Sequence, residues 1–165
     1  MLKYDSDIEG RLKRLRFSVN CLIACQFEPN GAVRPGEIPK EEIVGSWRKV
    51  GFYGREFGAM ACYSSSLDMG NVANFVHKIL VRKQMDYGHE NIRRFGRIGL
   101  IVRMQDKVAR LENLISKGTG DDPQNESLLD NVVDVMGYSA IGLMWESDTF
   151  LLPLKESDQA EVLPV

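Results

Sequence analysis

The sequence predicts an all-α protein that folds as one domain, and three observations lead to this class. Apolar residues recur at steps of three and four along several segments, which places them on one face of a helix. No segment shows the strict apolar–polar alternation of a confident strand. The length of 165 residues suits a single core. We expect residues 1–66 to form an N-terminal elaboration, 67–146 the core helices and 147–165 a tail.

The N-terminal part begins with a segment, Asp7 to Gln26, in which Leu, Arg and Val stand at helical spacing, which predicts an amphipathic helix. The segment from Glu28 to Pro39 contains three prolines and two glycines, so we expect a loop. Five aromatic residues and four glycines are mixed between Lys40 and Ser66, and we expect short helices or irregular structure there.

The C-terminal part gives clearer helix signals. Leu67 to Met85 predicts a helix that Asp86-Tyr87-Gly88 breaks, and its inward residues are Phe75, Val76, Ile79 and Leu80. Another helix is expected from Arg97 to Lys117, with Gly118 as its C-cap. Its inner stripe consists of Ile101, Met104, Val108, Leu111 and Ile115.

The last predicted helix extends from Pro123 to Trp145, with Asp122 as its N-cap and Pro123 at the first helical position. The tail from Glu146 onward contains two prolines and several acids. We expect this tail to pack loosely or to lie on a neighbouring subunit.

Composition argues against several functional classes. The net charge of −2 argues against a general binder of polymeric nucleic acid. No apolar run approaches the ~18 residues of a membrane span, and the N-terminal segment lacks the apolar core of a signal peptide, so we expect a cytoplasmic protein without membrane contact. The three cysteines predict no disulfide framework, and Cys21 and Cys25 are expected to be core thiols. Two histidines are too few for the usual zinc site.

A row of acids runs along the last predicted helix, where Glu126, Asp130, Asp134 and Tyr138 recur every four residues. This step puts neighbours in the row on adjoining turns. The rest of the helix is apolar and is expected to be buried, so the row must face a wet groove or a partner. One alternative is a solvated face, with Glu126 close to the positive end of the helix dipole.

The other alternative is a metal site. Oxygen ligands without His or Cys select Mg²⁺ or Mn²⁺. In a partly buried groove, unpaired carboxylates cost several kcal/mol each unless a cation is present. Because these like charges repel without metal, replacing Asp130 or Asp134 by Asn is expected to leave the free protein equally or more stable. The row alone leaves both alternatives open.

The preceding predicted helix carries basic residues on its polar side: Arg103, Lys107, Arg110 and Lys117. Asp106 lies among them and Glu112 lies at the edge of the apolar stripe. The simplest interpretation is an exposed face with an Asp106–Arg110 pair. A short connection makes the two helices antiparallel, however, and acids beside bases can hold a metal–triphosphate. Arg93, Arg94 and Arg97 form a second basic group nearby.

Three segments in this order, KQMDYG, VRMQDKVARLENL and ESLLDNVVDVMGY, resemble the nucleotide-modification-associated branch of the MazG-like all-α NTP pyrophosphatases, which is common in phage genomes. The resemblance extends from about Lys83 to Met144. It implies a MazG-like helical bundle, completed by a homodimer or homotetramer. It also implies Mg²⁺-dependent cleavage of an NTP or dNTP to a nucleoside monophosphate and pyrophosphate, within nucleotide-pool control or modified-nucleotide metabolism.

The resemblance also implies residue roles. Glu126, Asp130 and Asp134 are expected to bind Mg²⁺, with Asp106 or Glu112 completing the ligand set. Asn131 and Ala109 stand where that superfamily commonly has acids. The expected catalytic residues are Asp130, Asp134, Lys107 and Arg110. The expected substrate contacts are Asp86, Tyr87, Arg93, Arg94, Arg103, Lys107, Arg110 and Tyr138.

The substituted acids keep two other hypotheses open. One is a nucleotide-binding or sensing module without turnover, and the other is a helical interaction protein. No Walker-type phosphate-binding loop and no histidine cluster occurs in the sequence. A γ-phosphate-cleaving P-loop enzyme and a His–Asp metal phosphohydrolase are therefore not expected.

Overall fold

The computed structural model describes residues 6–62, 72–118 and 127–162. The helices are α1 (Ser6–Gln26), α2 (Lys40–Ala61), α3 (Val72–Tyr87), α4 (Glu90–Arg93), α5 (Gly96–Lys117), α6 (Leu128–Glu146) and α7 (Glu156–Val162). Apart from one isolated β-bridge between Phe27 and Val33, the regular structure of these residues is helical. The predicted all-α class is therefore confirmed.

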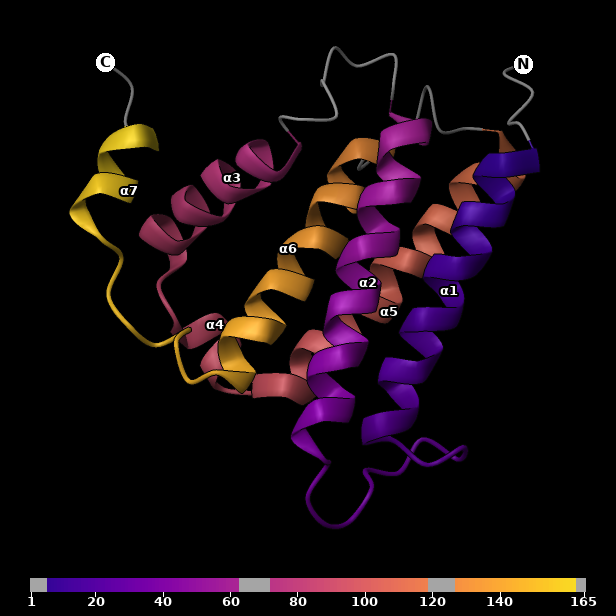
Figure 1. Cartoon of the computed structure of the whole chain (residues 1–165), viewed down its shortest axis with the longest axis horizontal. Coiled ribbons are helices and arrows are strands. Elements are labelled where there is room, and N and C mark those ends of the chain that lie inside the picture. Colours follow the sequence, from indigo (N-terminus) through magenta and orange to yellow (C-terminus); the bar gives the residue numbers. More distant parts are fainter. Residues whose placement is uncertain (1–5, 63–71, 119–126, 163–165) are drawn as a thin grey trace.

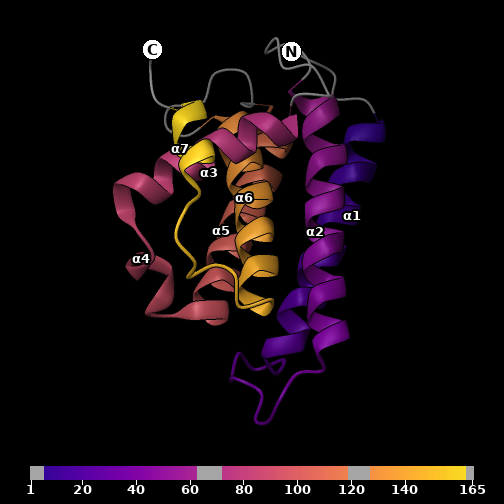
Figure 2. The same cartoon turned by 60° about the vertical axis from the view of Figure 1, so that its left-hand side comes forward.

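Four long helices, α1, α2, α5 and α6, lie side by side as a bundle (Figures 1 and 2). Their apolar faces meet in one buried core, to which α1 contributes Leu15 and Leu22, α2 contributes Trp47 and Phe57, and α5 contributes Met104. The helix α3 lies beside α6 outside this bundle, and α7 packs on α3. No described helix combines the length and the apolar character that a membrane span needs.

The expectation of short helices or irregular structure after Lys40 is wrong, because α2 is one continuous helix to Ala61. Its glycines do not break it and instead let α6 approach closely. A Cβ atom at Gly54 would lie 3.0 Å from the Val135 side chain, and one at Gly58 would lie 2.5 Å from Val132. Gly54 and Gly58 therefore serve packing between α2 and α6, whereas Gly45 faces open space.

The helix α5 agrees with the sequence prediction. It ends at Gly118, whose left-handed φ of 64° is the C-cap conformation that glycine adopts without strain. The five residues of the predicted inner stripe are all buried. The first helix and the loop after it are confirmed as well, with α1 ending at Gln26 and α2 beginning at Lys40.

The helix α6 begins at Leu128, later than predicted. Ser127 has the extended conformation of an N-cap and its side chain accepts a hydrogen bond from the Asp130 backbone. A helix that is continuous from Pro123 is therefore ruled out, because a capping residue has left the helical conformation. The predicted cap at Asp122 lies outside the described residues.

The C-terminal segment folds back onto its own chain up to residue 162, so this part does not pack loosely as expected, while the alternative of a tail on a neighbouring subunit stays a prediction. The chain turns at Asp148, whose φ is 57°, and Phe150 is only 5% exposed. The Phe150 ring lies 5.2 Å from the His89 ring and 6.3 Å from the Trp145 ring, measured between centroids. These contacts hold the segment across the ends of α3 and α6.

Candidate functional site

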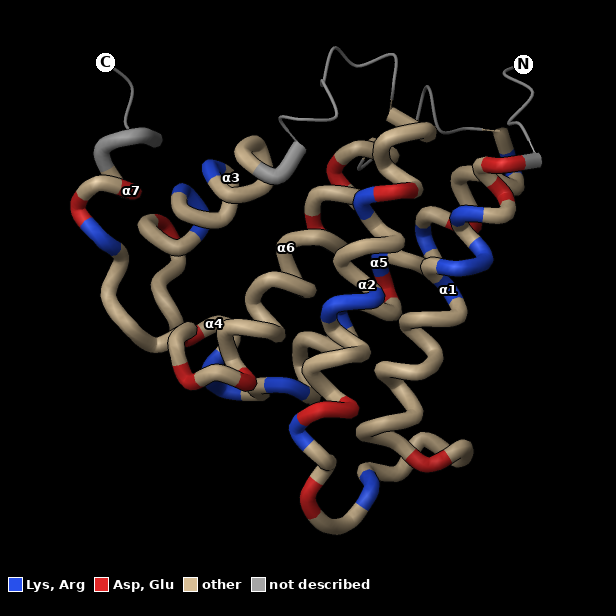
Figure 3. Tube along the Cα trace, in the orientation of Figure 1, with Lys and Arg blue, Asp and Glu red and all other residues tan. Residues whose placement is uncertain are grey.

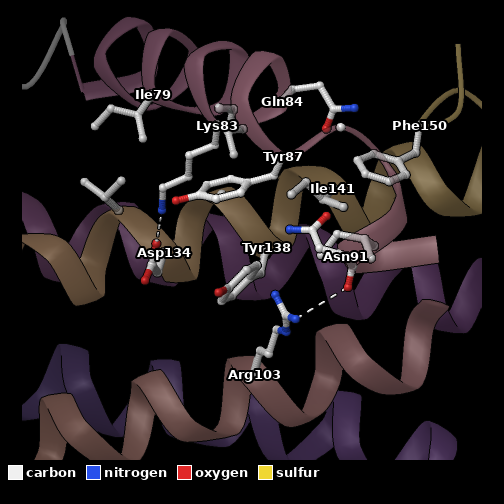
Figure 4. Close-up of a pocket in the computed structure, with 15 residues that line it drawn as sticks. Ile79, Lys83, Gln84, Tyr87, Asn91, Arg103, Asp134, Tyr138, Ile141 and Phe150 are labelled. Atoms are coloured by element: carbon white, nitrogen blue, oxygen red, sulfur yellow. Dashed lines mark hydrogen bonds and ion pairs between the residues drawn. The ribbon is translucent and has the colours of Figure 1, made fainter. Parts of the chain in front are cut away.

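A cavity of about 300 Å³ lies between α3, α5 and α6, beside α4 and the C-terminal segment (Figure 4). This volume is at the lower end of the range for ligand sites. The polar residues around it are Lys83, Gln84, Tyr87, Asn91, Arg103, Asp134 and Tyr138. The break after α3 shapes one side, because Gly88 has a left-handed φ of 63° and lines the cavity.

The centre of charge in this site is Asp134. Lys83 Nζ lies 2.8 Å from Asp134 Oδ1, and Lys107 Nζ lies 2.9 Å from Asp134 Oδ2. The side chains of Asp134 and Lys107 are only 14% and 17% exposed, whereas Lys83 is 51% exposed. One carboxylate on α6 is thus held by cations from two different helices, α3 and α5.

The helix α6 supplies acids but no cations to the site. No Lys or Arg occurs between Leu128 and Glu146, and Figure 3 shows its middle turns without charge. The cations come from the neighbouring helices, and Arg103 of α5 adds a third. Arg103 Nη2 donates to the Asn91 carbonyl oxygen at 3.5 Å. Two lysines therefore hold the one carboxylate and Arg103 lines the same cavity, so the cations outnumber the acid and make the site attractive to anions.

The two tyrosines occupy the middle of the cavity. Figure 4 shows Tyr87 from α3 and Tyr138 from α6 between the Lys83–Asp134 pair at one end and Phe150 at the other. Tyr138 is half-buried and Tyr87 is 66% exposed. Each offers an aromatic face and a hydroxyl group, which suits a ligand with both ring and polar parts.

Asp130 takes part in the N-terminal capping of α6. Its Oδ2 accepts hydrogen bonds from the Ser127 backbone N–H at 2.9 Å and from the Ser127 hydroxyl at 2.7 Å. These bonds, with smaller contributions from Lys107 and Lys83, hold the pKa of Asp130 below its usual value. The carboxylate is therefore charged, and one oxygen is engaged in the capping box.

Two of the other predicted metal ligands, Glu112 and Asp106, do not join Asp134. Glu112 is held by Arg16 of α1, with Oε1 2.7 Å from Nε and Oε2 2.6 Å from Nη2. Asp106 is exposed, and the expected Asp106–Arg110 pair does not form. Among the described residues no three His, Cys, Asp or Glu side chains are grouped to hold a metal, and Glu126 lies outside them. The expected protein-held metal cage is therefore absent from the part that the structure describes.

Some of the predicted basic residues lie at the cavity and others do not. Arg103 lines the cavity and Lys107 reaches it through Asp134. Arg110 is half-buried, and its Nε has no hydrogen-bond partner in the described structure. Neither Arg93 nor Arg94 lines the cavity: Arg93 pairs with Glu90 at 3.3 Å, and Arg94 lies over the Phe95 ring.

Two further predictions concern the end of α3. Tyr87 lines the cavity as expected, but Asp86 is exposed and does not. Sequence reasoning assigned no role to Lys83, although it opens the KQMDYG segment and stands four residues before Tyr87, on the same helix face. That spacing could have identified it. Nothing in the sequence marked Asn91 or Phe150 as part of a site.

A comparison with known proteins found no matching family model, no matching curated protein and no matching solved structure.

Proposed function

We propose that this chain binds a nucleoside triphosphate in the cavity and hydrolyses it, with Mg²⁺, to a nucleoside monophosphate and pyrophosphate. The observation that supports binding most directly is the pairing of Lys83 and Lys107 with one carboxylate at a cavity that Arg103 and two tyrosines also line. The hydrolytic reaction is the one expected from the resemblance of residues 83–144 to MazG-like pyrophosphatases.

The cations are suited to the phosphates. Lys83 is half exposed on a flexible stem, so it can exchange the Asp134 carboxylate for a phosphate oxygen. Arg103 lies on α5 one turn from Lys107 and offers the planar fork that binds phosphate oxygens in pairs. We therefore assign the triphosphate to the Lys83–Asp134 end and the sugar to the space between Tyr87 and Tyr138.

The described carboxylates suit a Mg²⁺ that arrives on the triphosphate better than one held by the protein alone. Mg²⁺ is commonly bound by one or two carboxylates together with substrate phosphates. Asp134 and Asp130, on successive turns of α6, are the residues that would meet it. When bound, Mg²⁺ polarises the phosphoryl group and lowers the pKa of an attacking water.

A second candidate function is nucleotide binding without turnover. The observation that favours it is the engagement of both Asp134 oxygens by lysines, together with the Glu112–Arg16 pair. In this alternative the lysines neutralise the acid permanently, and the phosphates bind to the remaining positive charge.

The decisive experiment measures binding and turnover together. The common ribo- and deoxyribonucleoside triphosphates are incubated with Mg²⁺, products are separated by chromatography, and melting temperatures are recorded with each nucleotide. Release of monophosphate and pyrophosphate supports hydrolysis, and a melting shift without products supports the binding module. Diphosphate with orthophosphate would contradict the reaction, and neither shift nor product would refute the whole proposal.

A matched pair of variants tests the cavity itself. Lys83→Gln removes one charge-assisted contact and is expected to weaken triphosphate binding about tenfold. Lys78→Gln changes an exposed lysine on the same helix that does not line the cavity, and should leave the affinity unchanged. Equal affinities of the two variants would place the phosphates elsewhere.

We also propose that the chain forms a homodimer or homotetramer. The outer side of α5 and its N-cap expose three large apolar side chains at helical spacing: Phe95 is 64%, Ile98 37% and Val102 55% exposed. Contiguous exposed apolar residues are typical of protein interfaces. Light scattering that reports 18.6 kDa at micromolar concentration would contradict this proposal.

A further inference from the structure

A second cavity, of about 210 Å³, adjoins the first. The two cavities share four lining residues, Leu80, Gln84, Ile141 and Phe150. Figure 4 shows Gln84, Ile141 and Phe150 at the end of the first cavity that is remote from the Lys83–Asp134 pair. The C-terminal segment forms the outer wall of the second cavity through Leu152, Leu154 and Asp158.

The lining of the second cavity is mainly apolar, with a few polar groups. His89 Nδ1 lies 2.7 Å from Gln84 Nε2, and the His89 ring meets the Phe150 ring edge-on at 5.2 Å. Asp158 of α7 adds a half-buried carboxylate. Apolar walls with a small number of polar groups are typical of sites for flat, partly polar rings.

We infer that the second cavity is the base subsite of the nucleotide site and that it selects purines. The inference rests on the proposed function, which assigns the triphosphate to the cationic end of the first cavity. With the sugar between Tyr87 and Tyr138, the base extends toward Phe150 and Gln84, where the two cavities adjoin.

Size favours a purine in this subsite. The first cavity alone is at the lower end for a drug-sized ligand, so a whole nucleotide needs the adjoining space. A two-ring purine fills the second cavity better than a one-ring pyrimidine, and unfilled apolar space loses dispersion contacts. The Asp158 carboxylate can accept a hydrogen bond from an exocyclic amino group of the base, which cytosine also carries, so the preference for purines rests on size.

The test fills the second cavity and leaves the first unchanged. Leu154→Trp places an indole ring in the proposed subsite, and Leu151→Trp is its control, because Leu151 is 49% exposed and lines neither cavity. Calorimetry measures the dissociation constants of a purine triphosphate, a pyrimidine triphosphate and inorganic tripolyphosphate, for the wild-type protein and both variants without Mg²⁺.

The wild-type protein is expected to bind the purine nucleotide about tenfold more tightly than the pyrimidine nucleotide, a difference in the range that apolar pockets achieve. Leu154→Trp should remove this preference and leave the tripolyphosphate affinity unchanged, whereas Leu151→Trp should change neither. Equal wild-type affinities for the two nucleotides, or a purine preference that survives in folded Leu154→Trp, would overturn the inference.

A second variant keeps the inference testable if Leu154→Trp does not fold. Asp158→Asn removes the charge of the proposed acceptor on the outer wall and is expected to weaken purine binding severalfold, with tripolyphosphate unaffected. An unchanged purine affinity would count against the base subsite. Failure of the wild-type protein to bind tripolyphosphate and every nucleotide would instead refute the proposed function, so the two failures are distinguishable.

Discussion

Replacing Asp134 by Asn is expected to destabilise the free protein, and this reverses the expectation drawn from the acidic row. That expectation assumed that the nearest charges to Asp134 are other acids. In the structure the nearest charges are the ammonium groups of Lys83 and Lys107, at 2.8 and 2.9 Å. Removing the carboxylate therefore removes two attractions.

The size of the expected loss of stability follows from the exposed fractions of the Asp134, Lys107 and Lys83 side chains. Exposed ion pairs contribute about 0.2–1 kcal/mol, and breaking a buried pair costs about 3–5 kcal/mol. Asp134 and Lys107 are 14% and 17% exposed and lie between these limits, while Lys83, 51% exposed, is near the lower limit. Because Asn keeps one acceptor oxygen, we expect a loss of about 2 kcal/mol, or a melting temperature about 4–8 °C lower for a chain of this size.

Urea unfolding followed by circular dichroism measures this change, with Asp106→Asn as the control. Asp106 is exposed on α5 and forms no ion pair with the described residues, so its replacement should change the free energy of unfolding by less than about 0.5 kcal/mol. The difference in the free energy of unfolding between Asp134→Asn and Asp106→Asn should become smaller in high salt, because salt screens the lost ion pairs. If Asp134→Asn is as stable as the wild-type protein or more stable, the repulsion argument was right and the lysine pairing contributes nothing.

Two further predictions concern helix packing and capping. Gly142→Ala would bring a Cβ against the buried Trp47 ring and should lower the free energy of unfolding by about 1–3 kcal/mol. Gly45→Ala, which has open space around it, should instead stabilise α2 by about 0.5–1 kcal/mol. Equal urea midpoints of the two variants would contradict this prediction. Ser127→Ala should cost about 1 kcal/mol at neutral pH. The bonds from Ser127 lower the pKa of Asp130 in the folded state, so the stabilisation by the Asp130 carboxylate is present above the usual carboxyl pKa and is lost as the pH falls through the lowered value. The difference in stability between wild type and Ser127→Ala should therefore shrink as the pH is lowered below the usual carboxyl pKa. A difference independent of pH would contradict the capping assignment.

The parts of the fold that the sequence predicted are those set by local spacing. The stripe from Ile101 to Ile115 and the glycine after Lys117 indicated α5 almost to the residue. The prediction failed at α2, where the same glycines that break isolated helices allow Val132 and Val135 to approach. That role depends on which helix packs against α2, and no local signal carries it.

The sequence predicted those parts of the candidate site that depend on local spacing and missed those that depend on contacts between distant helices. The spacing of Asp134 and Tyr138 places them together on one helix face, and the antiparallel helix brings Arg103 and Lys107 to them. Lys83 reaches Asp134 across 51 positions of sequence, so its pairing depends on how α3 lies against α6. Glu112 was misassigned because its partner, Arg16, lies on a helix that the sequence analysis treated as an elaboration.

The pairing at Asp134 has one more consequence, because the carboxylate and a bound triphosphate compete for the same lysines. In Asp134→Asn both ammonium groups lose their contact with the Asp134 carboxylate and one negative charge is removed, so tripolyphosphate without Mg²⁺ should bind more tightly. The expected gain is on the order of fivefold, which corresponds to the ~1 kcal/mol of attraction between two unit charges 4 Å apart in water. If the chain is a hydrolase, the same variant should lose pyrophosphate release with Mg²⁺, because the carboxylate that meets the metal is gone. Glu41→Gln, an exposed acid on α2 outside the cavity, should change neither quantity. Weaker tripolyphosphate binding by Asp134→Asn would show that Lys83 and Lys107 do not hold the phosphates, since removing the competing carboxylate can only strengthen contacts that these lysines make with phosphate.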